Sequence, residues 1–287
     1  MKPAPFKLVA PRSREEALAA LAEHDGDARV LAGGQSLVPL MNMRVVQPGV
    51  LVSINGCRDL DYIRLEDDRI VCGALARQAA AEESDLVRRR CPLLADAAPW
   101  IGGMANRNRG TVCGSLAHSD PLAELPAVAV ATDAEIVLAS RDGRRTLAAT
   151  DFFVGELATA IRPGEMVEAA RFATAWSGER TAFLEVSNRQ HAFAVAGVAV
   201  RLDLAPDGRC RDVRIAVMGG GPTAMRIEAG ERAVVGTTIG VEAARAAADA
   251  VERAVDPPTD IHADAAYRRR VLGVLTMRAL QQAAGRS

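Results

Sequence analysis

The chain has 287 residues, of which 49% are hydrophobic and 25% charged, and its formal net charge is -1. The length predicts two or three packed units rather than one small core, and the composition is ordinary for a globular protein. The net charge implies no general attraction to nucleic acid or anionic lipid. No apolar stretch is long enough to span a bilayer, and the N-terminus lacks a signal-peptide core, so we expect a cytoplasmic location.

Neither the cysteines nor the histidines show the spacing of a metal site. The five cysteines include no CxxC pair, which argues against a disulfide framework, an iron–sulfur cluster or a structural zinc. Small buried hydrophobic residues are the simpler interpretation of them. We therefore predict no metal ligand on this chain. The residues concerned are Cys57, Cys72, Cys91, Cys113, Cys210, His24, His118, His191 and His262.

The N-terminal region predicts a compact strand–helix–strand unit. Residues 11–24 form a helix that begins with a capping box, in which Ser13 is followed three residues later by Glu16. Residues 28–32 form a short buried strand that runs into Gly33-Gly34, and residues 50–54 form a second strand. The spacing is GGxS and not GxGxxG, so a Rossmann dinucleotide fold is unsupported.

The rest of the chain predicts further hairpins and helices, with strands and then helices near the C-terminus. Strands followed by helices indicate an α+β layer, a sheet with helices on one face. A polar linker at 175–180 predicts a domain boundary. The expected helices are 77–90, 92–100, 121–131, 240–255 and 263–284, and the expected strands are 62–65, 69–74, 134–138, 144–147, 166–172, 182–186, 192–204 and 210–218.

Two stretches rich in glycine and small polar residues have the character of ligand loops. Residues 111–115 read Thr-Val-Cys-Gly-Ser, and residues 31–37 read Leu-Ala-Gly-Gly-Gln-Ser-Leu. Glycine lets the backbone approach a ligand closely, and adjacent N–H groups and hydroxyls in a turn form a concave anion site. Residues 111–115 alone could equally be an ordinary polar loop. Together, the two stretches predict the two halves of a diphosphate-binding site.

Five longer motifs are distributed along the chain: KPAPF (2–6), AGGQSLVPLMNMR (32–44), RNRGTVCGSLAHSDPLAELPAV (107–128), DFFVG (151–155) and AYRRRVLGVLTMRAL (266–280). In this order they resemble one known family, the medium, FAD-binding subunit of molybdenum hydroxylases, the group of carbon monoxide dehydrogenase and xanthine dehydrogenase. The similarity covers essentially the whole chain.

The resemblance implies an α+β fold with a vanillate-oxidase (PCMH)-type FAD-binding domain over residues 1–176, made of two α/β subdomains of about 1–57 and 58–176. A C-terminal domain with a small antiparallel sheet and helices would cover residues 177–287. It further implies that Glu124 contacts the cofactor, although an acid that suits a helix N-terminus is the alternative. Arg107 and Arg109 would either neutralise phosphate or support the loop. The implied FAD-binding residues are Leu31, Ala32, Gly33, Gly34, Gln35, Ser36, Leu37, Ile101, Arg109, Gly110, Thr111, Cys113, Gly114, Ser115, Ala117, Asp120, Glu124 and Met166.

The sequence departs from the family pattern near the expected flavin site. Cys113-Gly114 stands where members commonly have Gly-Gly, which places a side chain in a tight turn. Residues 102–106 replace a segment that often holds a His-Pro pair. Residues 188–193 also differ, and His191 and Phe193 there are candidates to modulate the flavin ring, although a loop histidine is more often solvated.

The implied function is electron transfer within a larger oxidoreductase. FAD on this chain would take electrons from iron–sulfur clusters of a small subunit, while a large molybdopterin subunit oxidises the substrate. NAD, a quinone or oxygen would be the acceptor. No catalytic acid or base is expected here, since the cofactor carries the chemistry. The alternatives are a free-standing flavoenzyme of the same fold and a flavin-free assembly subunit.

Overall fold

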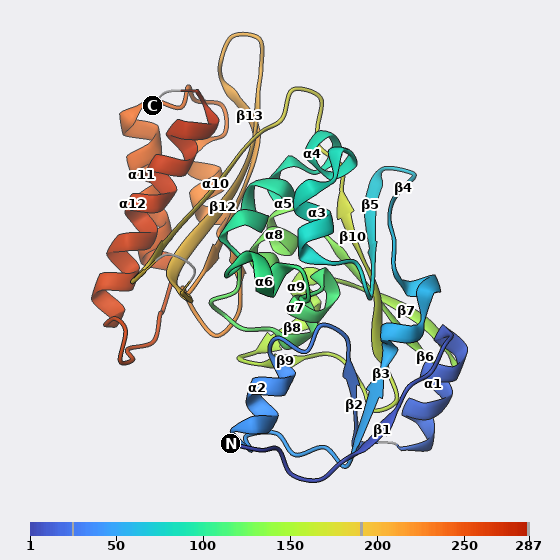
Figure 1. Ribbon diagram of the computed structural model, residues 1–287. Coiled ribbons are helices and arrows are strands. Elements are labelled where there is room, and N and C mark those ends of the chain that lie inside the picture. Colours follow the sequence, from blue (N-terminus) through green and yellow to red (C-terminus); the bar gives the residue numbers. More distant parts are fainter. Residues whose placement is uncertain (25, 190–191, 286–287) are drawn as a thin grey trace.

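The computed structural model describes residues 1–24, 26–189 and 192–285, which form an N-terminal, a central and a C-terminal region (Figure 1). Each region is built on its own β-sheet, and helices cover the sheets. The prediction of an α+β fold is confirmed.

The N-terminal region is a three-stranded parallel sheet with the order β1-β3-β2. Ser13 caps the first helix by accepting a hydrogen bond from the amide of Glu16, as the capping box predicts. The apolar face of that helix packs on the sheet through buried residues such as Leu18 and Leu21. The elements are β1 (Lys7–Val9), α1 (Arg14–Glu23), β2 (Ala28–Leu31), α2 (Leu37–Asn42) and β3 (Val50–Ser53).

The central region is a five-stranded antiparallel sheet with the order β4-β5-β10-β6-β7, and a two-stranded β8-β9 ribbon lies apart from it. Short helices connect and cover the strands. The strands are β4 (Ile63–Glu66), β5 (Arg69–Gly73), β6 (Glu135–Ser140), β7 (Gly143–Ala148), β8 (Phe153–Gly155), β9 (Ala158–Thr159) and β10 (Met166–Ala173). The helices are α3 (Gln78–Glu83), α4 (Asp85–Arg90), α5 (Pro92–Ala97), α6 (Met104–Arg107), α7 (Val112–His118), α8 (Glu124–Ala131) and α9 (Ala149–Phe152).

The structure corrects two predictions in this region. The expected helix 77–90 is two helices, because Ser84 leaves the helical conformation and caps α4 by accepting from the amide of Val87. Residues 111–115, expected as a turn, are instead the cap and first residues of α7. The Thr111 hydroxyl accepts from the amide of Gly114 and so begins that helix.

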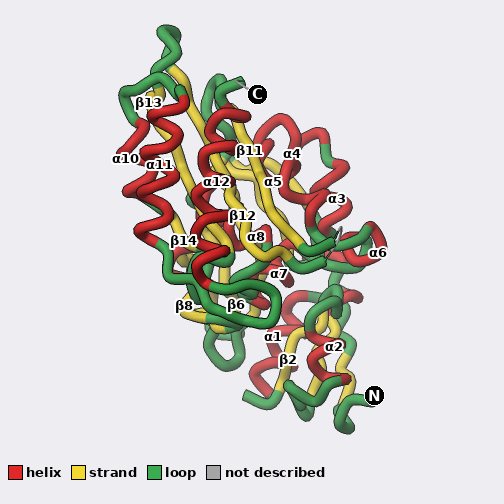
Figure 2. Tube along the Cα trace, turned by 90° about the vertical axis from the view of Figure 1, so that its left-hand side faces the viewer, coloured by secondary structure: helices red, strands yellow, loops and turns green. Residues whose placement is uncertain are grey.

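The C-terminal region is a four-stranded antiparallel sheet with the order β11-β12-β13-β14, and it lies between two layers of helices (Figure 2). Helices α10–α12 cover one face, and α5 and α8 of the central region pack on the other. Burial on both faces explains the nearly continuous apolar sequence of β12. The elements are β11 (Arg180–Ser187), β12 (Ala194–Leu204), β13 (Cys210–Met218), β14 (Met225–Arg226), α10 (Glu228–Val234), α11 (Val241–Ala254) and α12 (Ala265–Ala283).

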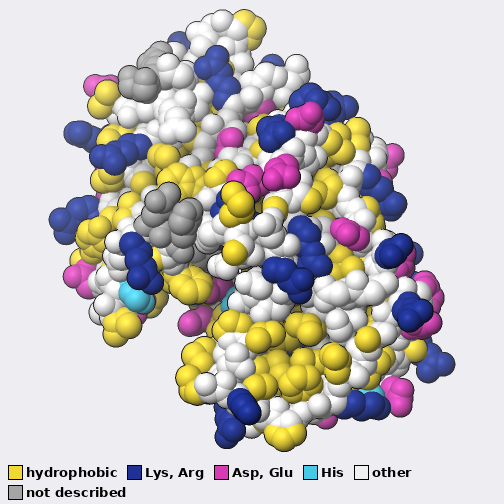
Figure 3. Space-filling view, in the orientation of Figure 1, with side chains coloured by type: hydrophobic (Ala, Val, Ile, Leu, Met, Phe, Trp, Pro, Cys, Tyr) yellow, Lys and Arg dark blue, Asp and Glu magenta, His cyan; other side chains and the backbone are white. Residues whose placement is uncertain are grey.

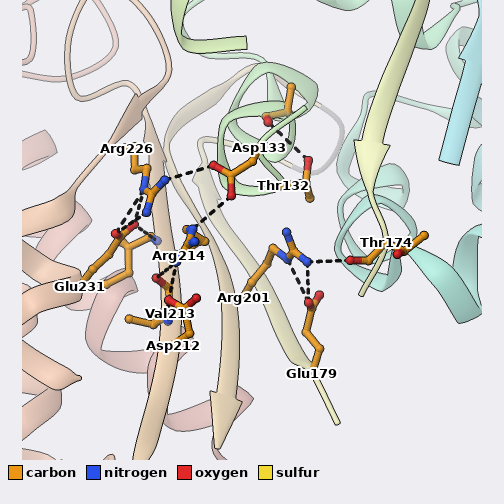
Figure 4. A network of polar contacts seen from close by, with 12 residues as sticks. Thr132, Asp133, Thr174, Glu179, Arg201, Asp212, Val213, Arg214, Arg226 and Glu231 are labelled. Atoms are coloured by element: carbon orange, nitrogen blue, oxygen red, sulfur yellow. Dashed lines mark hydrogen bonds and ion pairs between the residues drawn. The ribbon is translucent and has the colours of Figure 1, made fainter. Parts of the chain in front are cut away.

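Ion pairs join the C-terminal sheet to the central region (Figure 4). Asp133, which follows α8, accepts hydrogen bonds from Arg214 at 3.2 Å and from Arg226 at 3.1 Å. Arg201 of β12 pairs with Glu179 at 2.7 Å, and these two side chains are 1% and 2% exposed. The segment expected as a polar linker therefore contributes one member, Glu179, of a buried charge pair.

Candidate functional site

A cavity of about 1110 Å³ lies where the N-terminal, central and C-terminal regions meet. Its volume exceeds the usual range for a site that holds a drug-sized ligand, so a large cofactor is the appropriate class of occupant. Its walls include the loop after β2, the start of α7, the turn before β10 and the start of β12. Residues distant in the sequence are therefore brought to one site.

The two glycine-bearing stretches, the first loop (residues 31–37) and the second loop (residues 109–115), lie against each other in the wall of this cavity. A Cβ atom on Gly33 would overlap the carbonyl oxygen of Arg109 and lie 2.8 Å from the Cα of Gly110. Only glycine permits this approach of two backbones. Gly34 follows with φ of +74°, a conformation that L side chains rarely adopt. The predicted convergence of the two stretches is thus a property of the structure.

The first loop also offers backbone amides that are free to donate hydrogen bonds. Within the described part of the chain, no acceptor is bonded to the backbone amides of Gly34, Gln35 or Ser36. The amide of Cys113, in the first turn of α7, has no bonded acceptor there either. Buried or half-buried amides are normally paired, so a group of free ones beside a cavity suits an anionic ligand.

Apolar side chains form another part of the cavity wall. Leu37, Leu40, Val45 and Ile101 line it, and Figure 3 shows hydrophobic side chains gathered over the α2 region. An apolar wall beside free amides fits a ligand that joins aromatic rings to a diphosphate. The residues present therefore fit FAD.

The cavity is lined by 17 of the 18 residues that the sequence associates with FAD. Met166, at the start of β10, and Glu124, at the start of α8, reach it from the central region. Arg109 is the exception, because its side chain is exposed and does not line the cavity, whereas its carbonyl group touches the first loop. Arg107 supports the loop: it pairs with Glu82 at 2.7 Å and donates to the carbonyl of Gly102.

Cys113 does not disturb the loop that contains it. Its thiol is buried and points to the carbonyl oxygens of Cys72 and Gly73, at 3.4 and 3.5 Å. Burial raises the pKa of Cys113 to about 12, so the thiol stays protonated at neutral pH. A side chain is accommodated here because residue 113 is helical and faces the core.

Two acidic residues, Asp120 and Glu124, line the cavity, and a third, Glu185, lies near enough to Glu124 for their charges to interact. Burial raises the pKa of Glu124 to about 7, and Asp120 lies close enough to raise it further. Burial and the charge of Glu124 raise the pKa of Glu185, on β11, to about 8. Asp120 itself accepts from the amide of Leu122 at 2.9 Å. No basic side chain in the described residues pairs with Glu124 or Glu185.

Phe193, which the sequence indicated as a candidate near the flavin ring, is 79% exposed and lines the cavity. His191, the other candidate, lies outside the described residues. The sequence did not indicate several other residues that complete the cavity wall. His262, in the loop before α12, also lines the cavity, and no local motif identifies it. The additional residues include Thr159, Ile161, Arg162, Asn188, Arg189 and His262.

Comparisons with known proteins agree with this site. Residues 4–172 match the family model for the FAD binding domain in molybdopterin dehydrogenase, and residues 181–283 match that for the CO dehydrogenase flavoprotein C-terminal domain. The chain belongs to this family. It is an FAD-binding medium subunit of the molybdenum hydroxylase type, an electron-transfer component of an oxidoreductase complex.

Several relatives of this family match over almost their whole length. The chain is 39% identical to the 6-hydroxypseudooxynicotine dehydrogenase complex subunit alpha of Paenarthrobacter nicotinovorans, covering 100% of this chain and 97% of the relative. It is 36% identical to the carbon monoxide dehydrogenase medium chain of Hydrogenophaga pseudoflava, covering 99% and 98%. It superimposes on the solved carbon monoxide dehydrogenase from Hydrogenophaga pseudoflava with a TM-score of 0.96 at 38% identity, covering 100% and 99%. For quinoline 2-oxidoreductase from Pseudomonas putida 86, the TM-score is 0.94 at 31% identity, covering 99% of each chain.

In the described ranges, no group of three or more His, Cys, Asp or Glu side chains could hold a metal ion. Among the helices of residues 1–24, 26–189 and 192–285, none combines the length and apolar character needed to cross a membrane.

Proposed function

We propose that this medium subunit assembles with a large molybdopterin subunit and a small iron–sulfur subunit. Bound FAD supplies the redox chemistry, taking electrons from the iron–sulfur clusters and passing them to an external acceptor such as NAD, a quinone or oxygen. The chain's own residues bind and orient the cofactor. The support is that two glycine loops and free amides line one large cavity in a chain similar along its length to medium subunits.

We further propose specific roles within the cavity. The amides of residues 34–36 and 113 would hold the diphosphate, and the hydroxyls of Ser36 and Ser115 would add donors. Leu37, Ile101 and other apolar wall residues would exclude water from the rings. The FAD-binding domain would extend over residues 1–176, with subdomains of about 1–57 and 58–176, and residues 177–287 would form the C-terminal domain. The two matched ranges, 4–172 and 181–283, support a boundary near residue 176.

The substrate of the whole complex is outside this proposal, because relatives at similar identity carry different names. They include a glyceraldehyde dehydrogenase medium chain of Sulfolobus acidocaldarius and a caffeine dehydrogenase subunit beta of Pseudomonas, each 33% identical. Medium subunits that resemble this chain equally well carry the names of different substrates. This supports the proposal that another subunit selects the substrate.

Native purification and an absorbance spectrum test the proposal. We expect this chain to co-elute with two other chains and to show the oxidised flavin band near ~450 nm, a property of the cofactor. A free-standing flavoenzyme would show the band but elute alone. A flavin-free assembly subunit would co-elute with the two other chains. Denaturation would then release no flavin from this chain. Either result would overturn the proposal.

A further inference from the structure

We propose that Arg77 is a positioning residue that sets the spacing between the two glycine loops, with Asn55 as the link to the first loop. One guanidinium nitrogen of Arg77, Nη1, donates to the carbonyl oxygen of Arg109 at 2.6 Å. The other, Nη2, donates to Oδ1 of Asn55 at 2.8 Å. Arg77 thereby connects the second loop to a residue of the N-terminal region.

Asn55 extends this connection to the first loop. Its Nδ2 donates to the carbonyl oxygen of Ala32 at 2.9 Å and to that of Leu31 at 3.3 Å. These two residues directly precede Gly33, whose Cα faces the backbone of Arg109 and Gly110. A continuous chain of hydrogen bonds therefore runs from one loop through Asn55 and Arg77 to the other.

The backbone of Arg77 is itself fixed to the second loop. The amide of Gln78 donates to the carbonyl of Gly110 at 3.0 Å, and the amide of Val112 donates to the carbonyl of Ala76 at 2.9 Å. Arg77 thus pairs with Thr111 as an antiparallel bridge. Because its main chain and one guanidinium nitrogen hold the second loop, while the other nitrogen reaches the first loop through Asn55, the residue controls the separation of the loops.

Arg77 also differs from the ion-paired arginines of this protein in the charged groups that surround it. No carboxylate of the described residues lies within 4.0 Å of its guanidinium, whereas the partly buried Arg14, Arg107 and Arg171 each have such a partner. Burial and the neighbouring Arg109 lower the pKa of Arg77. Its planar guanidinium donates to two acceptors in fixed directions, which an ammonium group does not reproduce.

This inference rests on the proposed diphosphate role of the loops, and a double-mutant cycle tests it. The full chain, purified with its partner subunits and freed of flavin, is titrated with FAD as wild type, Arg77→Met, Asn55→Ala and the double variant. We expect each single variant to bind FAD at least about tenfold more weakly, since a charge-assisted bridge is lost. The double variant should be no weaker than the weaker single variant, because either change breaks the same bridge.

Two further variants separate geometry from charge and from general damage. Arg77→Lys keeps the charge but loses the two-acceptor geometry, so we expect it to resemble Arg77→Met. Arg64→Met is the control and should bind FAD like wild type, because Arg64 is exposed on β4, where it pairs with Glu66 and stacks on Tyr62. Circular dichroism melting of the flavin-free proteins checks folding, and if Arg77→Met fails to fold, Arg77→Lys replaces it in the cycle.

Each outcome is decisive. Wild-type affinity in the single variants, effects that multiply in the double variant, or full rescue by Arg77→Lys would overturn the positioning role. A wild-type protein that binds no FAD would instead overturn the proposed function, so the two failures are distinguishable.

Discussion

The Cα of Gly33 faces the carbonyl group of Arg109, so closely that a Cβ atom on Gly33 would overlap its oxygen. The two residues belong to different regions of the fold and to the two loops that line the cavity. This contact makes the first loop part of the packing of the second. The reason for glycine at position 33 is therefore contact between the loops, before any contact with a cofactor.

Gly33→Val should remove bound flavin by forcing the loops apart. We expect loss of the flavin absorbance and a loss of roughly 1–3 kcal/mol in the free energy of unfolding, typical of overpacking. Gly103→Ala is the matched control, since a Cβ there meets no atom within 4 Å. Urea unfolding and flavin content per chain measure both effects. A Gly33→Val protein with wild-type flavin content would contradict the loop contact.

Thr111→Val should weaken the start of α7. The change removes the hydroxyl that accepts from the amide of Gly114, which costs about 1 kcal/mol of unfolding free energy for a helix cap. Thr111→Ser keeps the hydroxyl and should retain most of the stability. Gly114→Ala tests the same contact from the other side, since its Cβ would lie 2.5 Å from the Thr111 hydroxyl oxygen. Equal stability of the Val and Ser variants in urea would argue against the cap.

The stability of the flavin-free protein should fall as pH rises from about 4.5 to about 8. The pKa of Glu185 is raised from its ordinary value of 4.5 to about 8, so the folded protein holds a proton that the unfolded chain releases in this interval. This contribution is fully present below pH 4.5 and is lost as pH passes 8. Glu124, with a pKa of about 7, acts in the same direction.

Glu185→Gln isolates the effect because an amide cannot ionise. We expect the variant to lose less stability than wild type between pH 5 and pH 8, measured by urea unfolding across that range. The exposed Glu242→Gln is the control and should follow the wild-type profile. Parallel curves for wild type and Glu185→Gln would show that Glu185 ionises freely in the folded state.

Arg201→Met should destabilise the junction between the central and C-terminal regions. The change leaves the carboxylate of Glu179 buried without its partner, which costs about 3–5 kcal/mol of unfolding free energy. Arg209→Met removes an exposed pair with Asp207 at 3.6 Å and should cost less than about 1 kcal/mol. Similar urea midpoints for the two variants would be incompatible with the burial of Arg201.

The sequence predicted most elements whose signal is local. The capping box at Ser13 and Glu16 and the strand 210–218 agree with the structure because both depend on neighbouring residues. The start of α7 was missed because glycine and Thr have low helix propensity, and the helix depends on the Thr111 cap and on pairing with residues 76–78. Helix α10 was also missed, since it is held by Glu231, which accepts from the amide of Ile215 sixteen residues away.

The residues of the candidate site likewise divide into those that the sequence indicates and those that it does not. Gly33, Gly34 and Thr111 could be selected from the sequence because glycine and small polar residues form recognisable loops. Arg77 could not, because its acceptors on Asn55 and Arg109 lie 22 and 32 residues away. Nothing in the sequence around residue 77 indicates either partner.

The walls of the cavity come from residues as far apart as Gly26 and His262. The complete cavity can therefore form only after almost the entire polypeptide has been synthesised. We therefore expect a chain truncated before residue 188 to lack the part of the cavity wall that Asn188, Phe193 and His262 provide.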